Sequence, residues 1–340
     1  MKAIQLLEPN LLVQRDMPIP EPAAAEVLIK VRTVGICGTD ISIYKGISPA
    51  PYPVVLGHEF CGDVVKVGTG VENVKPGDYV ISEASWGCGT CYFCQQGQPS
   101  YCEKPFVYGR TCDGALAEYV KAPARIVHRI SAKVQPVEAQ GVTAVATTLR
   151  ALRRSGINVG QSAAILGPGY TGLLLLQLAK QSGAAPVIVT GTNDDRLQAA
   201  ETLGADITVN IRRDGWLDKI LAATDGYGPD VVIEASGRPD ALEQALAMVK
   251  KGGRIIAFGI AGSPIENFEA GQLYKKDIAI MGSKGGYFEY GNAVKALESH
   301  RLKTRELVTH VFQLEDAPEA FRFITNNSRS VVRAVVEVNC

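Results

Sequence analysis

The pattern of hydrophobic and polar positions changes along the chain. From Ala3 to about Lys133, short apolar or alternating runs such as "EVLIKVRTVGIC", "GDVVKVGTGV" and "GDYVIS" are broken by Gly, Pro and Asp. Runs of this kind predict short strands joined by turns. The first part of the chain is therefore expected to form a compact, β-rich, barrel-like unit.

After a helical segment around Ala139–Ala151, solidly apolar strands alternate with helix-like stretches. The expected strands are Ser162–Gly167, Pro186–Gly191, Asp206–Asn210, Asp230–Gly237, Gly253–Gly259 and Asp277–Ser283, and the helix-like stretches include Thr171–Ser182, Asp194–Leu203 and Ala241–Val249. This alternation predicts a parallel sheet covered on both faces. From about Gly291 a helix and the strand "SVVRAVVEV" are expected to complete the first unit.

These patterns predict an α/β protein with two domains. A doubly wound parallel-sheet domain, residues 148–290, is inserted into a β-rich domain formed by residues 1–147 and 291–340. The balance of 35 Lys and Arg against 35 Asp and Glu gives no support to a polyanionic partner such as a nucleic acid.

The apolar segments do not indicate a membrane protein. Pro9 interrupts the N-terminus before a secretory signal could form, and the run "LLLLQLA" after Gly172 is far shorter than the ~18 residues of a membrane span. We therefore expect a cytoplasmic protein. In that reducing compartment, clustered cysteines are more often metal ligands than disulfides.

A glycine motif follows the first strand of the second domain. Gly167, Gly169 and Gly172 have G-x-G-x-x-G spacing, with Tyr170 and Thr171 inside the motif. Between a predicted strand and a predicted helix, such glycines allow backbone to approach a pyrophosphate at the helix N-terminus. The motif predicts a dinucleotide site.

The end of the second strand bears on the choice of coenzyme. Gly191 stands where an acidic residue normally accepts the ribose hydroxyls of NAD, while Thr192, Asn193 and Arg196 could hydrogen-bond a 2′-phosphate. The coenzyme is expected to be NAD(P), with NADP favoured. Asp194 is better placed to start the next helix.

Half of the eight cysteines lie within one short lobe, residues 87–103. Cys88, Cys91, Cys94 and Cys102 can supply four thiolates to one ion, which closes a tetrahedral zinc site. The lobe has few core residues of its own, so a metal is expected to organise it. This zinc should be structural.

A second set of potential ligands is Cys37, His58 and Glu59. Together they make the mixed sulfur, nitrogen and oxygen set expected for a catalytic zinc with an exchangeable position. Taken singly, each also fits an ordinary role as a buried thiol, a hydrogen-bonded histidine or a surface carboxylate.

Taken together, these residues and motifs resemble those of a known enzyme family. The chain resembles the zinc-dependent medium-chain dehydrogenases, especially their polyol and threonine dehydrogenase branch. The shared motifs are "GICGTD", "GHEF-G-V--VG", "V-PGD-V" (Val74–Val80), the four-cysteine lobe, "DGALAEYV", "GPGYTG" and "DVVIEASG".

The resemblance implies a GroES-like catalytic domain, a Rossmann coenzyme domain and two zinc ions per chain. The catalytic zinc would be held by Cys37, His58 and Glu59. Hydride would pass between a secondary alcohol (a polyol, diol, sugar alcohol or hydroxy-amino acid) and NAD(P), with Thr39 taking the hydroxyl proton and Ser42 relaying it. It also implies a homotetramer or homodimer.

Ligands of such sheets bind outside the carboxyl ends of the strands. The nicotinamide end of the coenzyme is therefore expected beside two segments at the ends of the fourth and fifth strands, which comprise Ala235, Ser236, Phe258, Gly259 and Ile260.

The sequence also departs from the resemblance. Related enzymes carry a glutamate or cysteine where this chain has Thr143, a poor zinc ligand, and threonine dehydrogenases carry a histidine where it has Ser42. Three alternatives therefore stay open: a zinc-free quinone or enoyl reductase, an NADPH-binding regulator with an impaired active site, and a zinc-ribbon nucleic-acid module. The absence of a basic stripe argues against the last.

Overall fold

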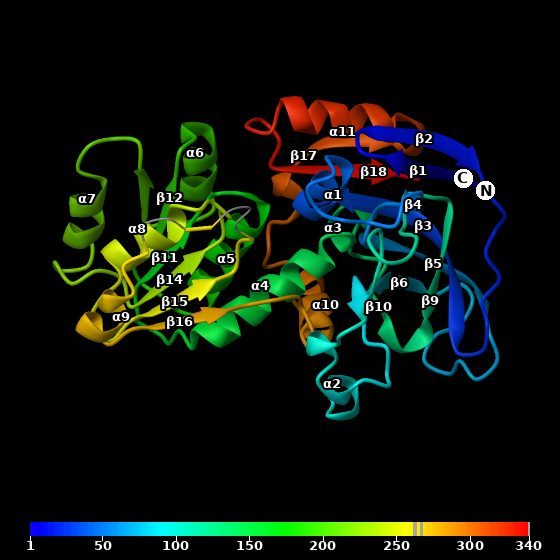
Figure 1. Cartoon of the computed structure of the whole chain (residues 1–340), viewed down its shortest axis with the longest axis horizontal. Helices are drawn as coiled ribbons and strands as arrows, with labels where there is room; N and C mark the ends of the chain where they lie inside the picture. Colours follow the sequence, from blue (N-terminus) through cyan, green and yellow to red (C-terminus); the bar gives the residue numbers. More distant parts are fainter. Residues whose placement is uncertain (261–263, 266–267, 339–340) are drawn as a thin grey trace. The chain divides into compact units, whose positions relative to one another are not determined.

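The computed structural model describes residues 1–260, 264–265 and 268–338. The chain forms two compact units, one made of Met1–Thr143 and Tyr290–Cys340 and the other of Ala144–Glu289. Figure 1 labels their elements. Cys340, which the sequence suggests is a free terminal thiol, lies outside the described residues.

The first unit is built mainly from antiparallel strands. Its largest sheet has the order β10-β6-β5-β3-β18-β17, with β9 also paired to β3. These strands are β3 (Glu26–Ile36), β5 (Glu59–Val67), β6 (Tyr79–Ser82), β9 (Tyr119–Pro123), β10 (Val127–Arg129), β17 (Val308–Gln313) and β18 (Arg333–Glu337). Smaller sheets are formed by β1 (Lys2–Glu8), β2 (Leu11–Asp16) and β4 (Val54–Val55), and by β7 (Ser85–Trp86) and β8 (Phe106–Val107).

The helices of this unit are short and surround the sheets. They are α1 (Gly38–Tyr44), α2 (Tyr92–Gln95), α3 (Pro136–Ala139), α10 (Tyr290–Glu298) and α11 (Ala317–Asn326). Helix α11 packs against β2, β17 and β18 (Figure 1). The core includes Phe60, Tyr108, Leu116 and Phe321, each at most 2% exposed.

The second unit contains a parallel sheet with the order β13-β12-β11-β14-β15-β16. Its strands are β11 (Ala163–Leu166), β12 (Val187–Gly191), β13 (Ile207–Asn210), β14 (Val231–Glu234), β15 (Arg254–Ala257) and β16 (Ala279–Gly282). The order reverses direction beside β11, as it does in doubly wound folds. The central strands β11, β12 and β14 are buried throughout, as expected for a sheet covered on both faces.

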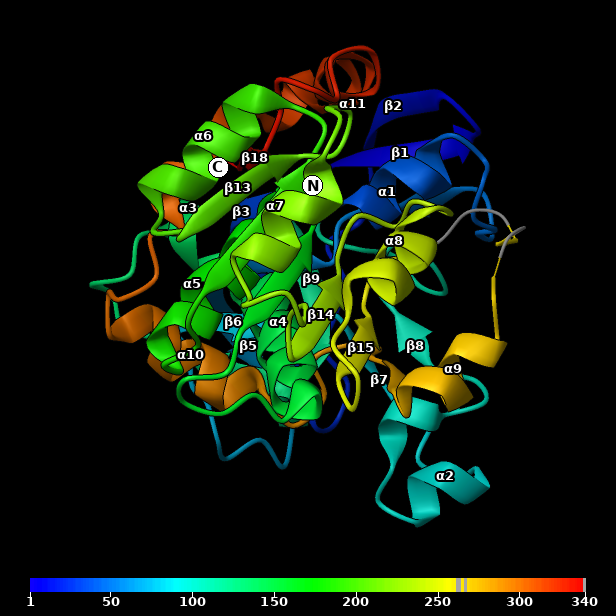
Figure 2. The same cartoon turned by 90° about the vertical axis from the view of Figure 1, so that its left-hand side faces the viewer.

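Helices cover both faces of this sheet (Figure 2). They are α5 (Tyr170–Gln181), α6 (Asp194–Thr202), α7 (Trp216–Ala222), α8 (Ala241–Met248) and α9 (Gly271–Lys276). Helix α4 (Val142–Ser155) precedes the first strand. Apolar side chains of α7 and α8, such as Ile220 and Leu246, join Val232 and Ile255 of the sheet in one buried cluster.

The predicted strands and helices of the second unit are confirmed with small shifts at their ends. The predicted C-terminal strand is also confirmed as β18, which pairs antiparallel to β3 and so completes the first unit. The sequence did not predict β17, which lies parallel to β18. Within the described residues, no helix is both long and apolar enough to cross a bilayer.

Candidate metal centres and coenzyme site

Cys37, His58 and Glu59 come from two neighbouring strands of the first unit. Cys37 follows β3 and is the N-cap of α1, and His58 precedes Glu59, the first residue of β5. Gly35 of β3 lies opposite Glu59 in the antiparallel register. One ligand atom from each of the three residues lies within 4.8 Å of the others. The structure therefore brings together the three residues expected to hold a catalytic metal.

Asp40 orients the imidazole of this cluster. Its carboxylate lies 3.2 Å from His58 Nδ1 and accepts hydrogen bonds from the N–H groups of Cys37 at 2.9 Å and Gly57 at 3.2 Å. Burial alone would raise the pKa of Asp40, but His58 and these N–H groups bring it below its ordinary value. A histidine held in this way at Nδ1 presents Nε2 to a metal. No pattern in the sequence indicated this role for Asp40.

Arg333 of β18 binds the carboxylate of Glu59, the third residue of this cluster. Its guanidinium pairs with Glu59 Oε2, lies 2.5 Å from Gln140 Oε1 and donates to the carbonyl of Ile36 at 3.1 Å. Glu59 Oε1 is 3.7 Å from His58 Nε2. One carboxylate oxygen is thus held by Arg333, and the other faces the imidazole nitrogen that is available to a metal.

Thr39 and Ser42, the predicted proton acceptor and relay, both lie in α1 and are partly buried. The hydroxyl of Ser42 lies 2.9 Å from the hydroxyl of Ser48, in the loop after the helix. Either oxygen can donate, so the pair can pass a hydrogen bond in both directions. No sequence motif pointed to Ser48.

Thr143, expected from the resemblance to stand where related enzymes carry a metal ligand, is 5% exposed. Within the described part of the chain, no group meets hydrogen-bond geometry to its hydroxyl oxygen. A buried hydroxyl without a partner is costly. Thr143 is therefore a buried hydroxyl whose hydrogen bonds the described residues do not supply.

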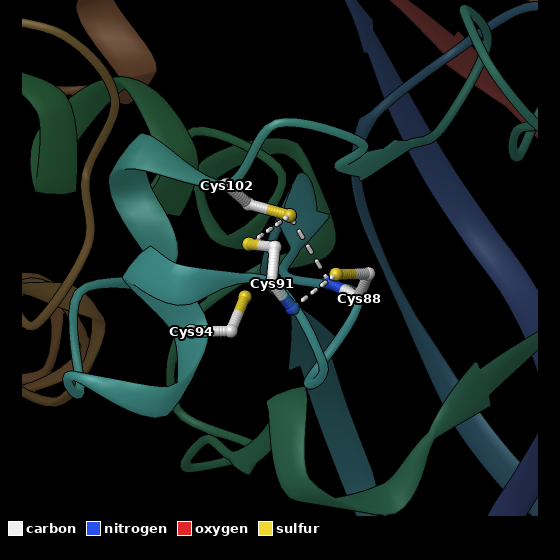
Figure 3. Close-up of side chains that lie close together, drawn as sticks. All are labelled: Cys88, Cys91, Cys94 and Cys102. Carbon is white, nitrogen blue, oxygen red and sulfur yellow. Dashed lines mark hydrogen bonds between the residues drawn. The ribbon is translucent and has the colours of Figure 1, made fainter.

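The four lobe cysteines converge on one point (Figure 3). Their sulfur atoms all lie within 4.8 Å of one another. The N–H of Cys88 donates to Cys102 Sγ at 3.2 Å, and the N–H of Cys91 donates to Cys88 Sγ at 3.4 Å. Helix α2 of the lobe buries no residue. The arrangement fits a tetrahedral tetrathiolate site.

Hydrogen bonds within the lobe favour the thiolate form of Cys88. Hydrogen bonds from the backbone and side chain of Thr90 and from the N–H of Cys91 lower the pKa of Cys88 to about 6. The thiolate is the form of cysteine that binds a metal. Cys88 is therefore prepared as a ligand by its own loop.

The residues predicted to bind the coenzyme gather at one edge of the parallel sheet. Gly167 follows β11 and Gly191 ends β12. The segments after β14 and β15 contribute Ala235, Ser236, Phe258, Gly259 and Ile260 at the same edge. Gly169 is the N-cap of α5, whose first residues are Tyr170 and Thr171. A Cβ at Gly172 would lie 1.9 Å from the carbonyl oxygen of Gly167, so only glycine allows this turn.

Glu234, at the end of β14, organises part of that edge. Its carboxylate accepts hydrogen bonds from the N–H and hydroxyl of Ser236, both at 2.7 Å, and from the N–H of Gly237 at 2.8 Å. Its carbonyl oxygen accepts the N–H groups of Phe258 and Gly259. No sequence pattern pointed to this residue, although its buried carboxylate holds the segment after β14 and its carbonyl oxygen holds the segment after β15, both expected beside the nicotinamide.

The end of β12 contains the residues predicted to read the adenosine ribose. Thr192 follows Gly191, and Asn193 caps α6 by accepting the N–H of Arg196 at 3.2 Å. The side-chain oxygen of Asn193 is therefore engaged by the helix. The expectation that α6 starts at Asp194 is confirmed.

Asp194 is held by one residue at the end of the neighbouring strand β13 and by one just after it. Its carboxylate accepts hydrogen bonds from Asn210 at 2.8 Å and from Arg213 at 3.0 Å. The hydrogen bond from Asn210 and the charge of Arg213 lower the pKa of Asp194. The acidic group nearest to the end of β12 is thus already paired.

Comparisons with known proteins agree with this geometry. Residues 23–132 match the alcohol dehydrogenase GroES-like domain, and residues 171–299 match the zinc-binding dehydrogenase domain. The chain therefore belongs to the zinc-binding alcohol dehydrogenase family. As such it is an NAD(P)-dependent oxidoreductase of alcohols or polyols, and the predicted GroES-like and Rossmann folds are confirmed.

Curated relatives and solved structures are similar over nearly the whole chain. An L-threonine 3-dehydrogenase of Bacillus velezensis is 36% identical and covers 90% of each chain. A sorbitol dehydrogenase of Halalkalibacterium halodurans is 33% identical and covers 91% of each. A protein of Sinorhizobium meliloti described as a zinc-binding dehydrogenase, bound to NADP, superposes with a TM-score of 0.93 at 31% identity and covers 99% of this chain and 98% of that one.

Proposed function

We propose that this protein is a zinc-dependent dehydrogenase of secondary alcohols, whose substrate is a polyol, diol, sugar alcohol or hydroxy-amino acid. The observation that carries the proposal is the convergence of Cys37, His58 and Glu59, with Asp40 on the far nitrogen of the imidazole. Three mixed protein ligands leave a coordination position for a substrate. The sorbitol and L-threonine dehydrogenases among the relatives support a hydroxyl-bearing substrate.

The donor atoms present fit a zinc ion. Cys37 Sγ, His58 Nε2 and Glu59 Oε1 would hold it. When bound, the ion supplies Lewis acidity that lowers the pKa of an alcohol. Asp40 keeps the imidazole oriented, and Arg333 holds the second oxygen of Glu59.

Alcohol oxidation removes a hydride from carbon and a proton from oxygen. We propose that Thr39 accepts this proton and that Ser42 and Ser48 carry it toward solvent. The 2.9 Å contact between the two serine hydroxyls supports such a path. A serine pair can relay a proton but cannot store one near neutral pH, so water or buffer must be the final acceptor.

The coenzyme is proposed to be NADP rather than NAD. Gly191 places no carboxylate at the end of β12, and Asp194 is already paired with Arg213. Gly191 brings no charge that would repel a 2′-phosphate, and Thr192, Asn193 and Arg196 remain the candidates to bind it. The NADP bound to the Sinorhizobium meliloti protein supports this choice.

The second zinc is proposed for the lobe, where four thiolates leave no open position and the metal replaces a missing core. We also propose a homodimer or homotetramer. Strand β16 ends the order of the parallel sheet, and its terminal residues Ala279 and Gly282 are exposed. An open strand edge can pair with a second copy.

The test is a screen of secondary alcohols with both coenzymes, together with zinc analysis of wild type and Cys37→Ser. Wild type should hold about two zinc ions per chain, and the variant about one, if each site takes one ion. The variant should lose alcohol oxidation and keep coenzyme binding. Full activity without the second zinc would favour a zinc-free reductase. NADPH binding without turnover on any alcohol would favour a regulator.

A further inference from the structure

Glu234 is a buried acidic residue at the carboxyl edge of the parallel sheet. It ends β14 and is 3% exposed. Its Oε1 accepts three hydrogen bonds at 2.7 to 2.8 Å, from the N–H and hydroxyl of Ser236 and from the N–H of Gly237. All three partners donate to it, which is the arrangement of a carboxylate, an acceptor-only group at neutral pH. The residue is therefore a fixed anion as well as a link between turns.

This anion has no cationic partner among the described residues. Its three hydrogen bonds come from neutral groups, and no lysine, arginine or histidine of the described chain forms an ion pair with it. The nearest basic residue in the sequence, Arg238, is exposed and pairs with both oxygens of Asp240 at 2.8 and 2.9 Å. A buried charge without a counter-charge is costly. A cation that binds beside Glu234 therefore gains more than it would gain in water.

Close backbone contacts place this anion at the glycine motif. Ser236, which Glu234 holds by two hydrogen bonds, lies against Gly167, because a Cβ at Gly167 would be 2.8 Å from Cβ of Ser236 and 3.0 Å from its backbone nitrogen. On the other side, a Cβ at Gly259 would lie 2.4 Å from Glu234 Oε2. The first glycine of the motif and both segments expected beside the nicotinamide therefore gather around one negative charge.

The coenzyme brings a positive charge to this edge in only one of its two redox forms. The protein is NAD(P)-dependent, and the nicotinamide ring is cationic when oxidised and neutral when reduced. With the nicotinamide end beside residues 235–236 and 258–260, the charge of Glu234 attracts the oxidised ring and has no comparable attraction for the reduced one. An interaction made with only one of two bound states shifts the equilibrium toward that state.

We propose that Glu234 is the counter-charge of the oxidised nicotinamide ring. It tightens the binding of the oxidised coenzyme relative to the reduced one and so lowers the reduction potential of the bound coenzyme. In carbonyl reduction, hydride passes from the reduced ring to the carbonyl carbon, the carbonyl oxygen takes a proton by the reverse of the proposed relay, and the ring becomes positive. The charge of Glu234 therefore favours carbonyl reduction on the enzyme. This inference rests on the proposed coenzyme site.

The test compares two dissociation constants of the zinc-loaded protein without substrate. Binding of NADPH is titrated by the fluorescence of the reduced ring, and binding of oxidised NADP by calorimetry. Glu234→Gln removes the charge but keeps the size of the side chain and an acceptor oxygen. It should raise the ratio of the oxidised to the reduced dissociation constant about tenfold, the order expected for one unit charge near another in a partly shielded site. That factor corresponds to a rise of about 30 mV in the potential of the bound coenzyme.

Three further variants separate the charge from its structural role. Asp230→Asn is the matched control, since Asp230 precedes the same strand at its opposite end and pairs there with Lys250 at 2.8 Å. Its ratio should equal that of wild type. Ser236→Ala removes a hydrogen bond to Glu234 and keeps the charge, so any loss should be shared equally by both forms of the coenzyme. Glu234→Ala is a second uncharged variant and should give the same ratio as Glu234→Gln.

Equal weakening of both forms in Glu234→Gln, or no change in either, would show that the carboxylate only holds the turns and would overturn the proposal. An equally large change of the ratio in Asp230→Asn would do the same, because the effect would then not depend on this position. If neither uncharged variant of Glu234 folds, the carboxylate is a requirement of the fold and the proposal is rejected. Failure of the proposed coenzyme site gives a different result, since wild type would then bind neither form.

Discussion

Arg333 and Glu59 form a buried ion pair, with 3% and 4% of each residue exposed. They are 274 positions apart in the chain. Strand β3 lies between them, because it pairs with β18 on one side and with β5 on the other. The last strand of the first unit therefore supplies the charge that fixes a predicted metal ligand.

Replacing this arginine should destabilise the protein strongly. Arg333→Leu leaves the Glu59 carboxylate, Gln140 Oε1 and the Ile36 carbonyl without their common donor. Breaking a buried pair in this way costs about 3–5 kcal/mol of unfolding free energy. Urea unfolding of the zinc-loaded protein measures the loss, and Arg110→Leu, at an exposed arginine, is the control. A loss no larger than that of the control would show that the pair does not stabilise the fold.

The fold could be predicted largely from the period of the apolar positions. The strands of the second unit are short, buried and regularly separated by helices, so their pattern predicts a parallel sheet. The lobe could be predicted because its ligands are close in the sequence. Strand β17 was missed because its residues are only partly buried and alternate weakly.

The supporting residues of the sites could not be predicted in the same way. Arg333 reaches Glu59 only through the register of three strands, and no local pattern encodes that register. Asp40 lies in the motif "GICGTD", but its role depends on where the fold places His58. Glu234 is the last residue of a short apolar strand, and no local pattern sets its buried carboxylate apart. Its function depends on a turn geometry that only the folded chain shows.

Asp40 should control metal affinity rather than metal identity. Asp40→Asn keeps the size of the side chain but removes the charge beside His58 Nδ1, so the imidazole becomes a weaker and less fixed ligand. Loss of such a partner typically weakens metal binding 10- to 100-fold. Competition with a chelator, followed by zinc analysis, measures this for the catalytic site. The lobe zinc of the same sample is the internal control. Equal release of both ions would contradict the assignment.

Loss of a thiolate from the four-cysteine lobe should lower the stability of the protein far more than its turnover number. Cys94→Ser removes one of four thiolates and leaves a segment with almost no core of its own. Folded yield and melting temperature should fall, while the turnover number of the protein that remains folded should change little. Cys112→Ser, at a half-buried cysteine outside both clusters, is the matched control. Loss of turnover at an unchanged melting temperature and zinc content would place the lobe in the reaction.

The coenzyme prediction concerns Gly191. A Cβ at this position would lie 2.7 Å from both Cγ and Cδ of Pro168, so Gly191→Asp alone would combine a clash with a charge. Pro168→Ala removes both ring atoms and provides the background for the test. There, Gly191→Asp should reduce kcat/KM for NADP by the equivalent of about 1–3 kcal/mol and shift the preference toward NAD, because its carboxylate repels a 2′-phosphate and accepts ribose hydroxyls. Gly191→Ala in the same background separates volume from charge and should leave the ratio of the two coenzymes unchanged. If Gly191→Asp also leaves that ratio unchanged, the choice between NAD and NADP is made by other residues.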